Sequence, residues 1–217
     1  MSEQVSVPRP MKREVYPMEI IGVISDQSNA PIMNKIRGNT ERLPYHIHTT
    51  GPGGNVSAGF ALMDMLGSMD VNVVYFVQGF CASMNACFIQ DRDFLRLCYP
   101  HTRFMFHSSK LKLEGSEEEI DNLYKNLKLY DTEIIQIVAD AVGMEFKEAK
   151  RKLFTHDKFF MGKDLLNVGE NGAVDGIIQT SLGDHKYLCN TRGGLKVIDT
   201  YIHQRSDIAG LPVWTKE

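Results

Sequence analysis

The sequence lacks the features that mark a protein for a membrane, for export or for nucleic acid. No part of its 217 residues approaches the run of about eighteen apolar residues that a membrane span needs. Its formal net charge is only -3, so no overall positive charge favours a polyanionic partner. The first residues carry prolines among charged side chains and not the basic and then apolar segments of a secretory signal. We therefore expect a cytoplasmic protein with neither a membrane nor nucleic acid as a partner.

Cysteine is scarce, and its spacing argues against the common cysteine-based sites. No CxxC pair occurs among the four cysteines, which are Cys81, Cys87, Cys98 and Cys189, so we expect reduced thiols and no structural zinc. His46 and His48 stand two residues apart on a predicted strand, the spacing that a metal pair needs. No carboxylate or thiol accompanies them, so an ordinary strand face is the better interpretation. We predict no metal and no cofactor.

The chain contains neither internal repeats nor low-complexity tracts, and its length fits one domain with extensions. Apolar and β-branched runs predict strands, and apolar residues at helical spacing predict helices between them. Strands are expected at residues 19–24, 45–49, 71–77, 94–99, 103–108 and 173–179, and helices at residues 31–40, 56–66, 83–89 and 145–154. This alternation predicts an α/β fold with a parallel-rich sheet.

The longest predicted helix begins at Ser116, where Ser116 and Glu119 form a capping-box pattern. Apolar residues then recur at helical spacing for about six turns, and Gly143 is expected to end the helix. A hairpin is predicted around the turn at residues 192–194. We divide the chain into a flexible arm (1–18), a main domain (19–180) and a carboxyl-terminal extension of unassigned role (181–217).

The parts of a nucleophilic serine site occur in this pattern. Such a site needs a base, a group that orients the base, and N–H donors for the oxyanion. Ser83 lies where an apolar strand meets a helix start, and the N–H of Met84 is free of a partner within that helix. Gly54 follows another strand and offers a second donor, because glycine lets a backbone approach a substrate. His107 is a candidate base, and Asp157 a candidate orienting group.

Each of these residues has a commoner structural explanation when it is taken alone. A serine at a helix start is usually an N-cap, and a histidine at a strand end is usually a core or rim residue. An aspartate between two charged residues is usually solvated. Their order and surrounding sequence are what favour catalysis.

Four segments in order resemble the Clp protease proteolytic-subunit (ClpP) family. GFCASMNACF resembles the family's nucleophile segment, which is close to GQAASMGA, and GPGGNVSAGFALMDML resembles its SPGG segment and the next helix. RFMFHSS resembles its histidine strand, and HDKFFMGKDLLNVGENGAVDGII resembles the segment that carries its aspartate. His107 follows Ser83 by 24 residues and Asp157 follows His107 by 50, close to the family's separations. The chain is identified by this resemblance as a divergent member.

The resemblance implies a ClpP/crotonase-like layered fold with a protruding handle helix, and the activity of a serine endopeptidase. Ser83 is the implied nucleophile, His107 the base and Asp157 the residue that orients it. The N–H groups of Gly54 and Met84 form the implied oxyanion hole. The resemblance also implies peptide or unfolded protein substrates, a homo-oligomer of stacked heptameric rings, and an AAA+ unfoldase as a partner.

The chain departs from the family pattern beside the implied nucleophile. Phe80, Cys81 and Asn85 stand where the family has glutamine, alanine and glycine, and SSKLKLEGS replaces a glutamine and a glycine-rich strand after His107. Two alternatives therefore stay open. One is a catalytically inactive ring or scaffold subunit. The other is a crotonase-type acyl-CoA enzyme, which also uses backbone N–H groups for an oxyanion but needs no serine-histidine pair.

Overall fold

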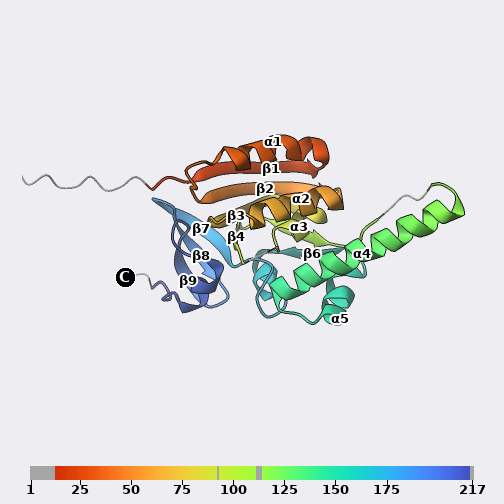
Figure 1. Cartoon of the computed structure of the whole chain (residues 1–217). Helices are drawn as coiled ribbons and strands as arrows, with labels where there is room; N and C mark the ends of the chain where they lie inside the picture. The colour runs from red at the N-terminus through yellow and green to blue at the C-terminus, as the bar shows by residue number, and fades with distance from the viewer. Residues whose placement is uncertain (1–12, 92, 111–113, 216–217) are drawn as a thin grey trace, which may run out of the picture.

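A computed structural model describes residues 13–91, 93–110 and 114–215, so most of the predicted arm (1–18) lies outside the described residues. Within them, nine strands form one sheet in the order β1-β2-β3-β4-β7-β8-β9, while β5 branches from β3 and pairs with β6 (Figure 1). The strands are β1 (Tyr16–Ile24), β2 (Tyr45–Gly54), β3 (Val73–Ala82), β4 (Leu95–Cys98), β5 (Arg103–Phe106), β6 (Lys158–Met161), β7 (Gly176–Gly183), β8 (Lys186–Thr191) and β9 (Gly194–Asp199).

Five of the eight strand pairings are parallel, and they join β1 to β2, β2 to β3, β3 to both β4 and β5, and β4 to β7. Antiparallel pairing joins β5 to β6, and β8 to β7 and β9. The predicted α/β fold with a parallel-rich sheet is therefore confirmed. The predicted hairpin after residue 180 is also confirmed, and its two strands extend the same sheet.

Strand β3 separates two hydrophobic cores because its side chains alternate between the faces of the sheet. Val73, Tyr75 and Val77 belong to a larger core beneath the helices. Val74 and Phe76 belong to a smaller core, which β8, β9 and the 3₁₀ helix Arg205–Gly210 supply with Cys189, Ile198 and Ile208. Burial on both faces explains why this strand reads as a continuous apolar run.

The helices are α1 (Asp26–Gly38), α2 (Val56–Gly67), α3 (Met84–Phe88), α4 (Glu117–Val142) and α5 (Phe146–Ala149). The predicted start of α1 at Pro31 was wrong, because a capping box of Ser25 and Ser28 begins the helix at Asp26, five residues earlier. The helix predicted at residues 145–154 is α5 followed by a π-helical turn, Lys150–Phe154. Strand β6 and the 3₁₀ helix Gly162–Asn167 were not predicted.

Helix α4 is the predicted handle. Ser116 and Glu119 form the expected capping box, and Gly143 ends the helix with a left-handed backbone (φ 69°). Its buried residues all lie between Ile134 and Val142. The amino-terminal half therefore has no core to pack on, and it projects from the body of the molecule (Figure 1).

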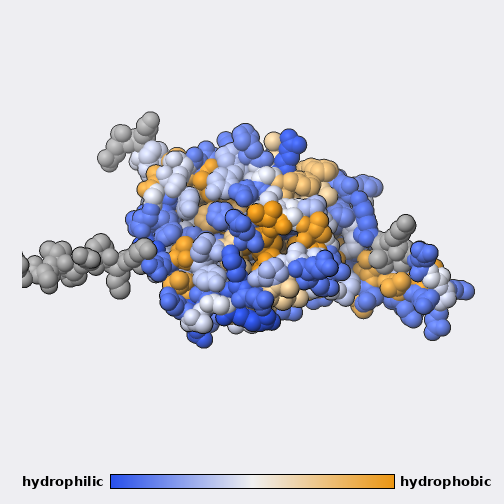
Figure 2. Space-filling view, turned by 90° about the horizontal axis from the view of Figure 1, so that it is seen from above, coloured by the Kyte–Doolittle hydropathy of each residue, from blue (hydrophilic) through white to orange (hydrophobic). Residues whose placement is uncertain are grey.

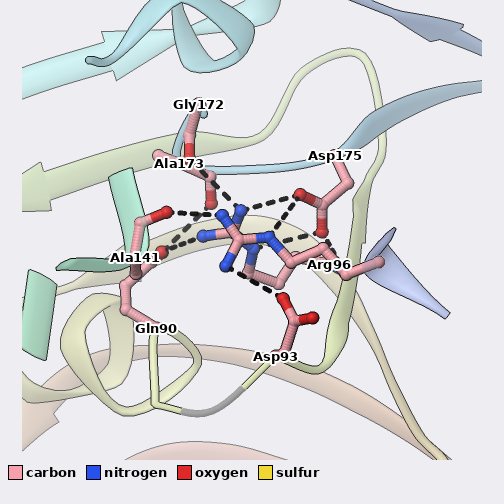
Figure 3. A network of polar contacts seen from close by, with 8 residues as sticks. Gln90, Asp93, Arg96, Ala141, Gly172, Ala173 and Asp175 are labelled. Carbon is pink, nitrogen blue, oxygen red and sulfur yellow. Dashed lines mark hydrogen bonds and ion pairs between the residues drawn. The ribbon is translucent and has the colours of Figure 1, made fainter. Parts of the chain in front are cut away.

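A buried ionic cluster fastens the end of the chain to the sheet (Figure 3). The fully buried Arg96 side chain of β4 donates to Asp175 through Nη2 at 2.7 Å and Nε at 3.2 Å. Arg205, which follows β9, donates to the same carboxylate at 3.1 Å. Asp175 thus holds two arginines that lie 109 residues apart in the sequence. Removal of either partner of such a buried pair leaves an uncompensated charge.

Candidate active site

Ser83 occupies a strained turn between β3 and α3. Its backbone has φ 54° and ψ -131°, a region that residues with a Cβ rarely adopt. The turn is held by a hydrogen bond from the Ser83 N–H to the carbonyl of Met105 (2.8 Å) and by one from the Cys87 N–H to the Ser83 carbonyl (3.0 Å). Strain of this kind concentrates at functional sites, and a sharp strand-to-helix turn is how several hydrolases expose a serine nucleophile.

Strand register brings the three predicted triad positions to one edge of the sheet. Strands β3 and β5 are parallel, with Ala82 opposite Met105, so Ser83 and His107 leave the sheet at the same end. Strands β5 and β6 are antiparallel, with Phe106 opposite Lys158. The next pair outward in that register is His107 and Asp157. His107 and Asp157, which are 50 positions apart in the sequence, are thereby brought close in space.

The backbone at the predicted oxyanion donors is tightly packed and depends on glycine. A Cβ at Gly53 would lie 2.6 Å from the Ser83 Cβ and 2.7 Å from the Met84 nitrogen. A Cβ at Gly54 would lie 2.1 Å from the carbonyl oxygen of Ile24. Both glycines have positive φ angles, so a side chain at either would be strained as well as crowded. The glycine segment of β2 (residues 51–54) thus lies directly against the turn at Ser83, the nucleophile turn.

The strand that carries His107 is anchored just after the histidine. Ser108 donates to the Phe154 carbonyl from its N–H (3.3 Å) and its hydroxyl (2.7 Å), and Ser109 donates its N–H to Asp131 of α4 (2.8 Å). These contacts tie the histidine segment to the π-helical turn and to α4. Among the described residues, the buried Nδ1 of His107 has no hydrogen-bond partner.

Asp157 pairs with a lysine that the sequence did not single out. Lys110 Nζ lies 3.0 Å from Oδ1 and 3.3 Å from Oδ2 of Asp157. The hydrogen bond from Lys110 is the main cause that lowers the pKa of Asp157, and the charges of Lys110, His107 and His156 lower it further. The carboxylate is therefore ionised and near His107, but it accepts its hydrogen bonds from Lys110. Nothing local in the SSKLKLEGS segment indicated this pairing.

Other candidate ligands in the sequence have structural roles. His46 and His48 both lie against the ring of Phe76, and burial lowers the pKa of His46 to about 4. No group of three or more metal-ligating side chains occurs in the part of the chain that the structure describes. Cys81 and Cys87 flank Ser83 but are buried, and burial raises the pKa of both thiols.

A model of the Clp protease family matches residues 24–181, about three quarters of the chain. This chain belongs to the Clp protease family. The matched span includes Ser83, His107, Asp157 and the glycine segment, and it ends within β7. Strands β8 and β9 and everything after them lie beyond it.

Similar proteins in the Clp family are distant in sequence. An ATP-dependent Clp protease proteolytic subunit of Bdellovibrio bacteriovorus is 26% identical over 141 residues, which cover 63% of this chain and 65% of that protein. Proteolytic subunit 1 of Bacillus cereus is 25% identical over 134 residues (61% and 67%). Proteolytic subunit 1 of Chlamydia trachomatis serovar D is 27% identical over 133 residues (58% and 66%). The chain spans about two thirds of the length of these relatives, and such identities fit a divergent member.

Within the described residues, no helix combines the length and apolar character needed to cross a membrane.

Proposed function

We propose that this Clp-family chain is a serine endopeptidase that hydrolyses peptide bonds through an acyl-enzyme. The observation that supports the proposal is the strained Ser83 turn, which lies at the same end of the sheet as the strand ends next to His107 and Asp157. Family membership supports it, since the similar proteins are proteolytic subunits by name.

In the proposed reaction, Ser83 Oγ attacks the peptide carbonyl carbon while His107 takes the hydroxyl proton. The N–H groups of Met84 and Gly54 receive the negative charge that develops on the carbonyl oxygen. His107 then gives its proton to the leaving amine, and water releases the acyl group by the same steps. Asp157 accepts a hydrogen bond from His107 Nδ1 and stabilises the charged imidazole. No cofactor takes part.

Asp157 has two competing partners in this scheme. His107 Nδ1 is buried without a hydrogen-bond partner among the described residues, and Lys110 holds the carboxylate that the nitrogen needs. The proposed reaction requires Asp157 to turn at least one carboxylate oxygen from Lys110 toward His107 Nδ1. Because the side chains of Lys110 and Asp157 are exposed to water, this reorientation costs little free energy.

The same observation favours a second candidate function, a Clp-family subunit whose triad is not assembled. If Asp157 stays with Lys110, the histidine lacks its orienting group, and the chain would contribute structure to an assembly but little chemistry. Reactivity of Ser83 separates the two candidates.

We extend the proposal to the assembly that the family implies. Peptide or unfolded protein substrates, stacked heptameric rings and a cytoplasmic location fit this assignment, and a partner AAA+ unfoldase would supply ATP dependence. Leu123, Tyr124 and Leu129 are exposed on the projecting half of α4, where apolar side chains suit a contact between subunits. Sedimentation of the purified chain tests the assembly.

A fluorophosphonate probe tests the proposed peptidase without any guess about substrate. It should add once per chain by intact mass, and Ser83→Ala should abolish the addition. Asp157→Asn should lower peptide turnover by about 10⁴, the cost of a wrong histidine tautomer in a serine protease. Absence of labelling in the wild-type chain would reject the peptidase and leave the inactive subunit.

A further inference from the structure

We infer that Thr49 and Asn85 are positioning residues that hold the glycine segment (residues 51–54) against the nucleophile turn. The inference rests on the proposed function, because that segment and Met84 carry the two proposed oxyanion donors. The pair would act on the reaction through the backbone and not by touching a substrate.

A buried hydrogen bond between side chains joins the two elements that carry these donors. Thr49 of β2 donates its hydroxyl to Asn85 Oδ1 at 2.8 Å, and both residues are fully buried (0% exposed). Asn85 is the second residue of α3, two positions after Ser83. Thr49 lies two positions before the glycine segment. The bond therefore spans from the nucleophile helix to the strand that ends in Gly54.

The sheet is irregular where the glycine segment begins, and the Thr49–Asn85 contact adds to the pairing of Gly53 and Gly54 with β1. The pairing of β1 with β2 shifts register between Ile21 and Val23, and the pairing of β2 with β3 shifts between Thr49 and Gly51. A shift of this kind disrupts the ladder of backbone hydrogen bonds that would otherwise fix a strand. Asn85 meets the backbone at this point, since a Cβ at Gly51 would lie 2.9 Å from its Nδ2.

Relative to the family pattern, this chain has a smaller residue at position 51 and a larger one at position 85. The family's SPGG segment has serine where this chain has Gly51, and its GQAASMGA segment has glycine where this chain has Asn85. A Cβ at position 51 would lie 2.1 Å from the Gly22 carbonyl oxygen and 2.9 Å from Asn85 Nδ2, so the β1 backbone and the Asn85 amide both occupy that space. The Thr49–Asn85 contact is thus a feature of this chain and not of the pattern it resembles.

Two substitutions at Thr49 separate positioning from simple structural support. Thr49→Val keeps the side-chain shape but removes the hydroxyl, and Thr49→Ser keeps the hydroxyl. In Thr49→Val, amide hydrogen exchange of a peptide covering residues 50–55 should quicken by about tenfold, the scale of one lost buried hydrogen bond. A peptide from β8 and β9 should exchange as in the wild type. Thr49→Ser should match the wild type in both peptides.

Catalysis should follow the same pattern. Thr49→Val should slow fluorophosphonate labelling of Ser83 and kcat for a peptide by about tenfold with KM unchanged, because a shifted oxyanion donor weakens binding of the transition state more than of the substrate. Asn85→Ala should add little to Thr49→Val, since both break one bond. Equal exchange and equal labelling in Thr49→Val and Thr49→Ser would overturn the inference. Absence of labelling in the wild type would reject the peptidase instead, and exchange would still decide whether the pair holds the segment.

Discussion

Replacement of Lys110 by methionine should speed the reaction of Ser83. Asp157 accepts hydrogen bonds from Lys110 on both of its oxygens, whereas the proposed chemistry needs it to accept one from His107 Nδ1. Methionine keeps the length and apolar character of the lysine stem but cannot donate. Asp157 would then be free to orient the histidine, and a larger fraction of molecules would have an assembled triad.

The size of the effect follows from the exposure of the ion pair. The side chains of Lys110 and Asp157 are 69% and 45% exposed, and ion pairs this open to water are weak. We therefore expect an increase of about two- to fivefold in labelling rate, and no more. Lys110 lowers the pKa of Asp157, and without it the carboxyl would return toward its ordinary value of about 4. Asp157 stays ionised at neutral pH in either protein, so the gain should be the same from pH 6 to 8.

The assay is the rate of fluorophosphonate addition by intact mass, with Lys125→Met as the matched control. Lys125 is 68% exposed and pairs with Asp121 on α4 at 2.6 Å, so it loses a similar ion pair away from the site. Added salt should raise the wild-type rate toward that of Lys110→Met, because salt screens exposed pairs. Slower labelling of Lys110→Met than of Lys125→Met would refute the reasoning and show that Lys110 helps Asp157 to act.

Three further changes test other parts of the structure. Gly53→Ala should slow labelling by about 100-fold or more, because its Cβ would lie 2.6 Å from the Ser83 Cβ at a φ of +95° and displace the oxyanion donors. Asp175→Ala should lower the free energy of unfolding in urea by about 3–5 kcal/mol, because it leaves the buried Arg96 unpaired. In the wild-type chain, the free energy of unfolding should fall by about 3 kcal/mol as the pH drops from 6.5 to 4. The reason is that His46, with a folded pKa of about 4, protonates more readily in the unfolded chain. His46→Asn should remove this loss.

Each of these changes has a control of the same type in an open part of the molecule. Gly210→Ala should label normally, since no atom lies within 4 Å of the added Cβ. Asp70→Ala should unfold like the wild type, because Asp70 is 98% exposed and its ion pair with Arg42 is long, at 3.9 Å. His101→Asn changes an exposed histidine and should leave the acid loss of stability intact. Equal effects in a control and its partner would mean that the substitution type, and not the site, is responsible.

Features encoded by nearby residues could be predicted, and those set by distant contacts could not. Helix α4 was predicted because its capping box and apolar spacing are local signals. Strand β6 was missed because its four residues, two of them largely exposed, lie between loops and derive their strand conformation from pairing with β5. The branch of β5 from β3 depends on pairing across the chain, which no single segment encodes.

The candidate site divides in the same way. The positions of Ser83, His107 and Asp157 were predicted from short motifs and their spacing, and their catalytic roles stay predictions. Lys110 was missed because its partner lies 47 residues away, on a segment whose approach is set by strand register. The Thr49–Asn85 contact was also missed, although Asn85 was already noted as a departure from the family pattern.

The buried cysteines give the protein its own reporters of local opening. Thiol reagents need both access and a thiolate, and burial denies both: it raises the pKa of Cys98 and Cys189 to about 12 and raises those of Cys81 and Cys87 as well. Cys189 lies in the smaller core beneath the hairpin, while Cys81 and Cys87 lie in the larger core beside the nucleophile turn. The order in which these thiols react with a slow alkylating reagent would therefore reveal which side of the sheet loosens first.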